Sequence, residues 1–368
     1  MKNLLYITPR LDGSGGLPKM FSVKTKYLVE QLGYQITILT TNARSNSYFF
    51  DFSKATIRNQ HIPGKGLFYF YNYLKIVKQQ IKKQNPDIIV IVDNGLKGLL
   101  LPYFLKNKKN TLIFEQHGHR YYADFEENSS FLKKIKQKIL NSFVDISIAK
   151  VDQLVVLTPE SKLEWKTKKC IAIPNPVWFA PFYHNALTQK RAIAVGRQVY
   201  EKGFDLLLAI WKQVVADYPD WILDVYGEKD QELGLEKLAK ELHLEKNVHF
   251  HAPVLSIFEK YKEASVFLMT SRHEGFGMAL VEAMACGLPC IAFDCPTGPR
   301  EIIENGKNGF LIPMFDQNEY AIKVKEILEN KDLRLQKGNQ ALQSVERFKL
   351  DVVMQQWDDL YTSFKYKY

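Results

Sequence analysis

The sequence predicts an α/β protein with two doubly wound domains that face each other across a cleft. Three observations predict this fold class. Short apolar runs alternate with amphipathic stretches, which is typical of parallel sheets covered by helices on both faces. The alternation is interrupted by a proline-containing segment and then restarts. The length of 368 residues also exceeds one ordinary hydrophobic core and suits two domains.

The first domain, residues 1–177, is predicted from five strand-like runs and the helical stretches between them. Residues 23–32 and 131–144 are amphipathic, with an apolar residue at about every third or fourth position. The strand-like runs lie at residues 4–8, 35–41, 87–92, 111–116 and 153–158.

The second domain follows residues 174–188, which contain three prolines, lack periodicity and indicate a linker. We assign the linker to residues 178–189 and the second domain to residues 190–349. Its strand-like runs lie at residues 191–196, 221–227, 248–254, 264–271, 289–294 and 309–313. In sheets of this kind ligands bind beyond the carboxyl ends of the strands, so site residues are sought there.

Composition excludes disordered and fibrous classes, since 46% of residues are hydrophobic and 24% are charged. The charge is uneven: residues 1–150 contain 23 Lys and Arg against 10 Asp and Glu, whereas the remainder contains 27 against 30. A basic first domain is explained either by a well-solvated lysine surface or by attraction to an anionic membrane. We expect no nucleic-acid partner.

The N-terminal apolar run, residues 4–7, is too short for a signal peptide, and no run approaches the ~18 apolar residues of a membrane span. We therefore expect a cytoplasmic protein, with the inner face of the membrane as a place of peripheral attachment. The cysteines form no CxxC pair and are interpreted as buried core thiols: Cys170, Cys286, Cys290 and Cys295.

Two loops at predicted strand ends carry groups that suit phosphate. The stretch DGSGG, residues 12–16, follows the first strand, and its glycines allow a ligand close to a helix start. It is not GxGxxG, which disfavours a nicotinamide dehydrogenase, and a simple turn is an alternative. In GRQVYEKG, residues 196–203, Arg197 and Lys202 flank a loop before a helix. Two cations there suit a diphosphate, although solvated surface cations are the ordinary alternative.

A third loop, EGFGMALVE, places Glu274 and Glu282 eight positions apart around the start of a helix. Backbone amides from Phe276 to Leu280 could hold a phosphate while the carboxylates accept hydrogen bonds from sugar hydroxyls. Complementing the helix dipole would explain Glu282 alone but would not explain Glu274.

These motifs together resemble retaining glycosyltransferases of family 4, which have the GT-B fold. The resemblance rests on the E-x7-E element at residues 274–282, GRxxxxKG at 196–203, IPNP at 173–176 and the segment GLPCIAFDCPTGPREII. It is strong over residues 190–315 and looser before residue 110. It implies that a C-terminal helix, residues 350–368, completes the first domain.

The resemblance implies a role for each matching position. Arg197 and Lys202 would neutralise the donor diphosphate, Glu282 would bind the ribose, and Glu274 would hold the transferred sugar. His117, in EQHGH, would lie beside the reaction centre, with His119 as a rival. The catalytic residues would thus be His117, Glu274, Arg197 and Lys202. The donor-binding set would comprise Gly15, Gly16, Arg197, Lys202, Val254, Glu274, Phe276, Gly277, Met278, Ala279, Leu280 and Glu282.

The resemblance implies a hexose or N-acetylhexosamine passed from a nucleoside diphosphate sugar, by analogy a UDP-sugar, with retention of configuration. Saccharides or lipid-linked saccharides of surface polysaccharide or glycolipid assembly would be the acceptors. The sequence contains no Asp-x-Asp, so we expect no metal and no other cofactor. A nucleotide-sugar epimerase and a non-catalytic sugar-binding protein are the alternatives. Aromatic and basic stretches at residues 66–84 and 120–139 suit an anionic bilayer, although Phe and Tyr at this spacing also occur in cores.

Overall fold

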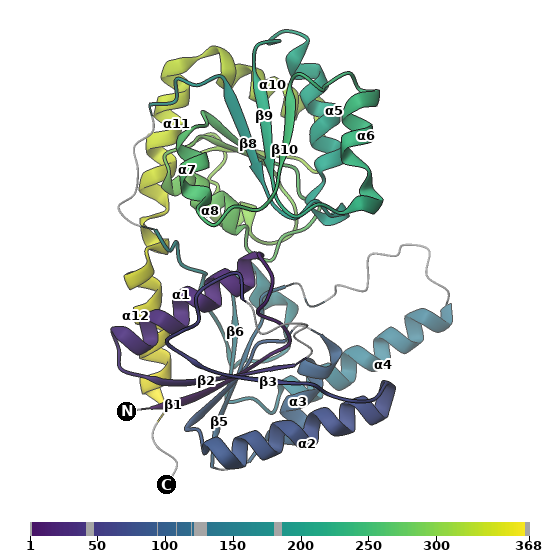
Figure 1. Cartoon of the computed structure of the whole chain (residues 1–368), viewed down its shortest axis with the longest axis vertical. Helices are drawn as coiled ribbons and strands as arrows, with labels where there is room; N and C mark the ends of the chain where they lie inside the picture. Colours follow the sequence, from purple (N-terminus) through teal and green to yellow (C-terminus); the bar gives the residue numbers. More distant parts are fainter. Residues whose placement is uncertain are drawn as a thin grey trace. The chain divides into compact units, whose positions relative to one another are not determined.

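A computed structural model describes residues 2–41, 48–93, 95–107, 109–118, 120, 131–179 and 186–364. The chain divides into two compact units, Met1–Pro174 with Asp351–Tyr368, and Asn175–Leu350. Each unit is a parallel sheet with helices on both faces, which confirms the predicted doubly wound class (Figure 1).

In the described part of the first unit, seven strands pair in the order β3-β2-β1-β4-β5-β6-β7. Their bounds are β1 Asn3–Thr8, β2 Gln35–Thr41, β3 Thr56–Gln60, β4 Ile88–Ile91, β5 Thr111–Glu115, β6 Gln153–Val156 and β7 Cys170–Ala172. β4 is a fully buried apolar run, which is why it was readable in the sequence, and β5 is also fully buried. The strands β3 and β7 were not predicted, because the first is polar and partly exposed and the second is three residues long and buried only at its first residue.

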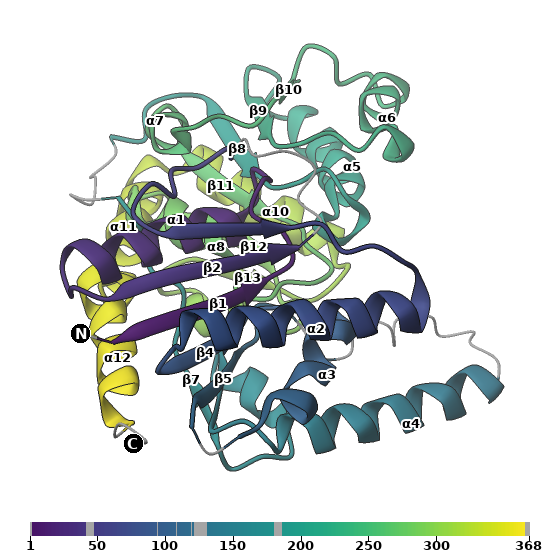
Figure 2. The same cartoon turned by 60° about the horizontal axis from the view of Figure 1, so that its bottom comes forward.

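Alternation along β1 divides the helices of this unit between the two faces of its sheet. Leu5 and Ile7 share a core with residues of α2, α3 and α4, whereas Tyr6 packs edge-on against Phe21 of α1 and bonds to Tyr361 of α12. Figure 2 shows α2, α3 and α4 next to one another. The helices are α1 Gly16–Glu30, α2 Gly66–Gln84, α3 Leu96–Leu105, α4 Phe131–Ile148, the 3-10 turn η1 Glu160–Glu164, and α12 Leu350–Ser363.

The second unit repeats the same strand order, β10-β9-β8-β11-β12-β13, over its described residues. Its strands are β8 Arg191–Val195, β9 Ile222–Tyr226, β10 Val248–His251, β11 Val266–Met269, β12 Cys290–Phe293 and β13 Phe310–Ile312. Its helices are α5 Phe204–Val215, α6 Leu235–Glu241, α7 Ile257–Lys262, α8 Met278–Ala285, α9 Pro299–Ile302, α10 Gln317–Glu329 and α11 Lys331–Ser344. Three 3-10 turns complete it: η2 Tyr200–Lys202, η3 Gln231–Leu233 and η4 Glu346–Phe348.

The strand order reverses direction between β1 and β4 in the first unit and between β8 and β11 in the second. In open α/β sheets, the loops at the carboxyl ends of the two strands beside such a switch point diverge and leave room for a ligand. The loop after β1 contains Gly15, and the loops after β8 and β11 contain Lys202 and Glu274. The topology therefore puts the motif residues where ligands bind.

No helix among the described residues has both the length and the apolar character needed to cross a membrane.

Candidate active site

Lys202 and Glu274 meet at the switch point of the second unit. The Lys202 Nζ lies 2.7 Å from Glu274 Oε1, although 72 residues separate them in the sequence. Glu274 is buried, and the Ser271 hydroxyl donates to the same carboxylate oxygen at 2.7 Å. An ammonium has three donors, so this contact leaves Lys202 able to bind a phosphate oxygen as well.

Gly203 allows the loop that carries Lys202 to pack directly on the end of β11. Its φ is +63°, and a Cβ atom there would lie 2.0 Å from the Thr270 carbonyl oxygen. The Thr270 hydroxyl donates back to the Gly203 carbonyl at 2.8 Å. The turn at Gly203 is thus a close approach between two loops.

Arg272 also fixes this loop, and sequence analysis did not single it out. Its guanidinium donates to both carboxylate oxygens of Asp205, at 2.8 and 2.6 Å, and to the Tyr200 carbonyl at 2.7 Å. Burial tends to raise the pKa of Asp205, but the hydrogen bond and charge of Arg272 outweigh it and lower this pKa. A signal was present, because Arg272 belongs to the same loop as Glu274.

The other predicted cation, Arg197, follows β8 and is exposed. Its guanidinium therefore remains accessible to solvent and ligand, in contrast to the partly buried Lys202.

Glu282 lies about one turn into α8 and is buried. The Tyr261 hydroxyl of α7 donates to its Oε2 at 3.1 Å. Burial and the nearby charge of Glu282 raise the pKa of Tyr261 well above its ordinary value, so this hydroxyl stays a donor. Sequence analysis missed Tyr261 because only the packing of α7 on α8 brings the two side chains together.

The start of α8 is rigidly shaped. Gly277 is the N-cap residue with φ +94°, and Phe276 is buried edge-on against Phe348 at 5.4 Å. The first N–H groups, from Gly277 to Ala279, have no acceptor within the helix. The Leu280 amide, in contrast, donates to the Gly277 carbonyl at 3.0 Å, so its predicted availability to a phosphate is reduced.

The remaining predicted donor contacts are simpler. Met278 and Ala279 are partly buried in the first turn of α8, and Leu280 is fully buried in the core. Val254 is partly buried in the loop after β10. In the first unit, Gly15 caps α1, which begins at Gly16, and a Cβ atom on Gly15 would meet nothing within 4 Å.

His117 lies two residues beyond β5 with its Nε2 2.9 Å from Glu115 Oε1. Lys24 of α1 bonds to the other carboxylate oxygen at 2.7 Å, and both members of this ion pair are buried. His119, the predicted rival, lies outside the described residues. Glu115 and Lys24 were not predicted, because the first lies in a strand-like run and the second in an amphipathic stretch where a lysine is ordinary.

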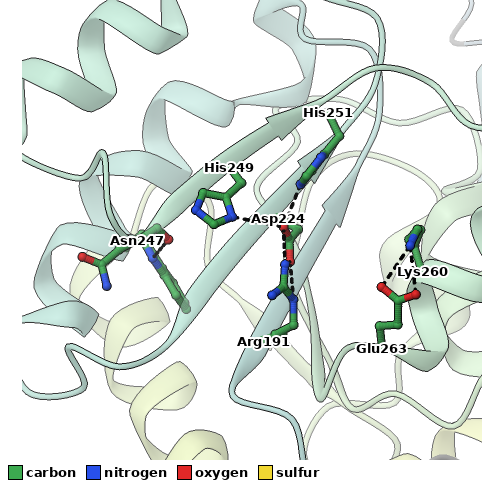
Figure 3. Close-up of polar contacts among 8 residues, drawn as sticks. Arg191, Asp224, Asn247, His249, His251, Lys260 and Glu263 are labelled. Carbon is green, nitrogen blue, oxygen red and sulfur yellow. Dashed lines mark hydrogen bonds and ion pairs between the residues drawn. The ribbon is translucent and has the colours of Figure 1, made fainter.

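A separate polar cluster lies on the sheet of the second unit (Figure 3). Ligand atoms of Asp224, His249 and His251 lie within 4.8 Å of one another, close enough to share a metal ion. Arg191, however, already donates to both oxygens of Asp224, at 2.8 and 2.9 Å. A metal would have to compete with this guanidinium, so the cluster is a weaker cation site than its residue types indicate.

Comparison with solved structures defines the fold class of the protein. Two Rossmann-like units in one chain form the GT-B fold, and solved glycosyltransferases share it across the chain. Sucrose-phosphate synthase from Thermosynechococcus elongatus matches with a TM-score of 0.82 at 18% identity, covering 98% of this chain and 99% of that one. WaaG, a glycosyltransferase involved in lipopolysaccharide biosynthesis, matches with a TM-score of 0.77 at 18% identity, covering 98% and 100%.

Sequence relatives give the activity. Residues 180–344 match the family model of glycosyl transferases group 1. An uncharacterized glycosyltransferase of Haemophilus influenzae is 26% identical over 97% of this chain and 99% of its own. The amylovoran biosynthesis glycosyltransferase AmsD of Erwinia amylovora is 27% identical over 98% and 99%. The protein is therefore a glycosyltransferase with the GT-B fold.

Proposed function

We propose that the protein is a retaining glycosyltransferase of family 4 that needs no metal ion. It moves a hexose or an N-acetylhexosamine from a UDP-sugar to a saccharide or lipid-linked saccharide in surface polysaccharide or glycolipid assembly. The observation that carries this proposal is the Lys202–Glu274 contact beside the start of α8, with Glu282 buried one turn further on. Lys202 and the free amides at the start of α8 would bind the diphosphate. Glu274 and Glu282 would accept hydrogen bonds from the sugar hydroxyls on either side of it.

The roles follow from charge. As the bond from the anomeric carbon to the phosphate oxygen breaks, negative charge grows on the diphosphate and positive charge grows on the sugar ring. Lys202, Arg197 and the first amides of α8 hold the diphosphate more strongly as this charge develops, so they stabilise the transition state. Glu274 orients Lys202 and accepts from hydroxyls of the transferred sugar, and Glu282 accepts from the ribose.

Retention requires the acceptor oxygen to bond to the anomeric carbon on the face that the diphosphate leaves. Because the acceptor attacks on that same face in one step, no protein nucleophile is needed, and the leaving phosphate oxygen takes the acceptor's hydroxyl proton. A Cβ atom placed on Gly15 would meet nothing within 4 Å, which leaves room for a ligand at the start of α1 in the first unit.

UDP is the donor nucleotide to test first. Solved structures of similar fold are described as complexes with UDP, among them Anabaena Alr3699/HepE and, with GlcNAc, the pneumococcal O-GlcNAc transferase GtfA. The relative AmsD is named for amylovoran biosynthesis, which supports a saccharide acceptor.

The test combines binding and turnover. UDP-, GDP- and ADP-sugars are compared by thermal shift, and we expect the UDP-sugar to raise the melting temperature most. The same sugars are then incubated with acceptor extract, and UDP release and the anomeric configuration of the product are measured. Conversion to another nucleotide sugar without UDP release would favour the epimerase, and binding without any turnover would favour a sugar-binding protein.

Metal independence is tested in the same assay. We expect transfer to persist in chelator, because Arg197 and Lys202 supply the charge that a metal would supply. A loss that Mn²⁺ restores would contradict this. The Asp224→Asn variant then shows whether the ion acts at the cluster of Figure 3, because only an ion bound there would lose its effect.

We also propose peripheral attachment of the first unit to an anionic membrane. On α4, Ile135, Ile139, Phe143 and Ile146 are exposed at helical spacing, so they form one apolar stripe. At the start of α2, Leu67 (90% exposed), Phe68 and Tyr71 are exposed as well. α2 and α4 both neighbour α3, as Figure 2 shows, and we call these seven side chains the apolar surface.

The positive charge of the first unit favours an anionic lipid as the partner of the apolar surface. α2 carries Lys75, Lys78, Lys82 and Lys83 and no acidic residue, and the first 150 residues have an excess of 13 positive charges. Aromatic and aliphatic side chains beside lysines suit the boundary between acyl chains and anionic headgroups.

A further inference from the structure

The strongest unexplained contact in the first unit is a buried chain of polar groups that ends on His117. Lys24, Glu115 and His117 come from α1, the end of β5 and the loop after it. Their side chains are 1%, 1% and 7% exposed. An ion pair buried this deeply is weak evidence for stability, because apolar side chains of similar volume often replace such pairs without loss. Its connection to a histidine at a strand's carboxyl end points to function.

Glu115 uses one oxygen for each neighbour. Its Oε2 accepts from Lys24 Nζ at 2.7 Å, and its Oε1 lies 2.9 Å from His117 Nε2. The main chain between them is also fixed, since the Gln116 amide donates to the Val155 carbonyl of β6 at 2.9 Å. Both the side chain and the backbone of this segment are therefore held in one arrangement.

The C-terminal helix closes the other side of the chain of contacts. The Lys24 ammonium lies 3.1 Å from the centroid of the Trp357 ring and 5.5 Å from that of Tyr6. α12 is in turn tied to the sheet, because the hydroxyls of Tyr6 and Tyr361 lie 2.7 Å apart. An aromatic ring attracts a cation, so Trp357 helps to keep a charged ammonium beside Glu115.

We propose that Glu115 is a positioning residue for His117, and that Lys24 and Trp357 hold Glu115 in place as a carboxylate. An ionised Glu115 accepts from Nε2–H, which fixes the ring plane and puts the proton on Nε2. The other ring nitrogen, Nδ1, then carries no proton in the neutral ring and can accept a hydrogen bond. This inference rests on the proposed function for the part that His117 plays in transfer.

The first test reads the tautomer of His117 without any need for activity. In ¹⁵N spectra of the whole protein, we expect the Nε2–H signature for His117, and we expect Glu115→Gln to change it. Asp93→Asn is the matched control, because Asp93 is also a buried carboxylate just beyond a central strand, β4. An unchanged His117 signature in Glu115→Gln would overturn the proposal.

The second test asks whether Glu115 acts through His117. We expect Glu115→Gln to lower kcat for transfer about 10- to 100-fold with little change in the KM for the donor. In a His117→Ala background the same substitution should cost nothing further, because the group that it positions is gone. An equal loss in both backgrounds would show a structural role for Glu115 and overturn the proposal. If no transfer is found with any nucleotide sugar, the proposed function fails, while the ¹⁵N result still decides the positioning.

Discussion

The two units have the same strand order but present very different surfaces at their strand ends and helices. In the second unit, the loops after β8 and β11 pack backbone to backbone at Gly203 and Thr270, and both site carboxylates are buried. In the first unit, the glycine loop is open at Gly15, and α2 and α4 expose large apolar side chains. A preformed, rigid arrangement of this kind suits a ligand part that never changes, such as a diphosphate. An open, basic and apolar surface suits a larger partner.

The largest effect is expected from a substitution of Lys202. Lys202→Ala should lower kcat/KM by ~100-fold or more, about 3 kcal/mol of transition-state stabilisation, because the ammonium opposes the charge that develops on the diphosphate. The control is Lys237→Ala on α6, whose side chain is exposed and pairs only loosely with Glu241, at 3.7 Å. Equal activities of the two variants would remove Lys202 from the site.

The close packing of the loops at Gly203 and Thr270 is tested by comparing two glycines, one from each unit. Gly203 and Gly33 both have positive φ, +63° and +70°, so an alanine strains both backbones similarly. At Gly33 the new Cβ meets nothing within 4 Å, whereas at Gly203 it meets a carbonyl at 2.0 Å. We expect Gly33→Ala to cost about 1 kcal/mol in the free energy of unfolding and Gly203→Ala about 3 kcal/mol or more. Urea unfolding measures both, and similar costs would contradict the close approach.

The ion pairs of the two units should respond differently to acid. Burial tends to raise the pKa of Glu115, but the charge of Lys24 and the hydrogen bond from His117 outweigh it and hold this pKa at about 2. A carboxyl group whose pKa is lowered by folding stabilises the folded state at pH values above its ordinary pKa. This contribution is lost as the pH falls toward the pKa in the folded state. The wild type should therefore lose on the order of 2 kcal/mol between pH about 4.5 and about 2 that Glu115→Gln does not lose.

Asp205→Asn provides the comparison from the second unit. The pKa of Asp205 is also lowered, by Arg272 against the effect of burial, but its side chain is 32% exposed and its pair is screened by water. Urea unfolding at several pH values should show that Asp205→Asn changes the pH dependence of the free energy of unfolding less than Glu115→Gln does. A larger loss there would contradict the burial argument.

The smallest expected effect concerns the open surface. Ile139→Glu with Phe143→Glu should weaken flotation with phosphatidylglycerol vesicles about 10-fold, because two apolar side chains no longer enter the interface. Ile322→Glu on α10 is the matched control, since Ile322 is similarly exposed in the other unit. Binding to phosphatidylcholine should be weak throughout. Equal flotation of the two variants would contradict lipid as the partner of the apolar surface. Self-association of the wild type that the double variant abolishes would contradict it as well, and would indicate a second copy of the chain instead.

The fold was largely predictable because its signals are local. Buried parallel strands such as β4 are continuous apolar runs, and glycines with turns mark their ends. The strand β3 carried no such signal because it is polar and partly exposed, and β7 carried none because it is three residues long and buried only at its first residue. The motif residues Lys202, Glu274 and Glu282 could be chosen from the sequence because their strand-end positions follow from the alternation of elements.

The amino-acid pattern was enough to predict the two doubly wound domains and the residues at the carboxyl ends of their strands, because periodicity and turn residues act over short stretches of chain. The partners that hold those residues depend on tertiary packing. Tyr261 on Glu282, Arg272 on Asp205, Lys24 on Glu115 and Trp357 on Lys24 join positions 21 to 333 residues apart. Such contacts depend on how helices pack on sheets, and in a single sequence a buried lysine or tyrosine looks like any other core or surface residue.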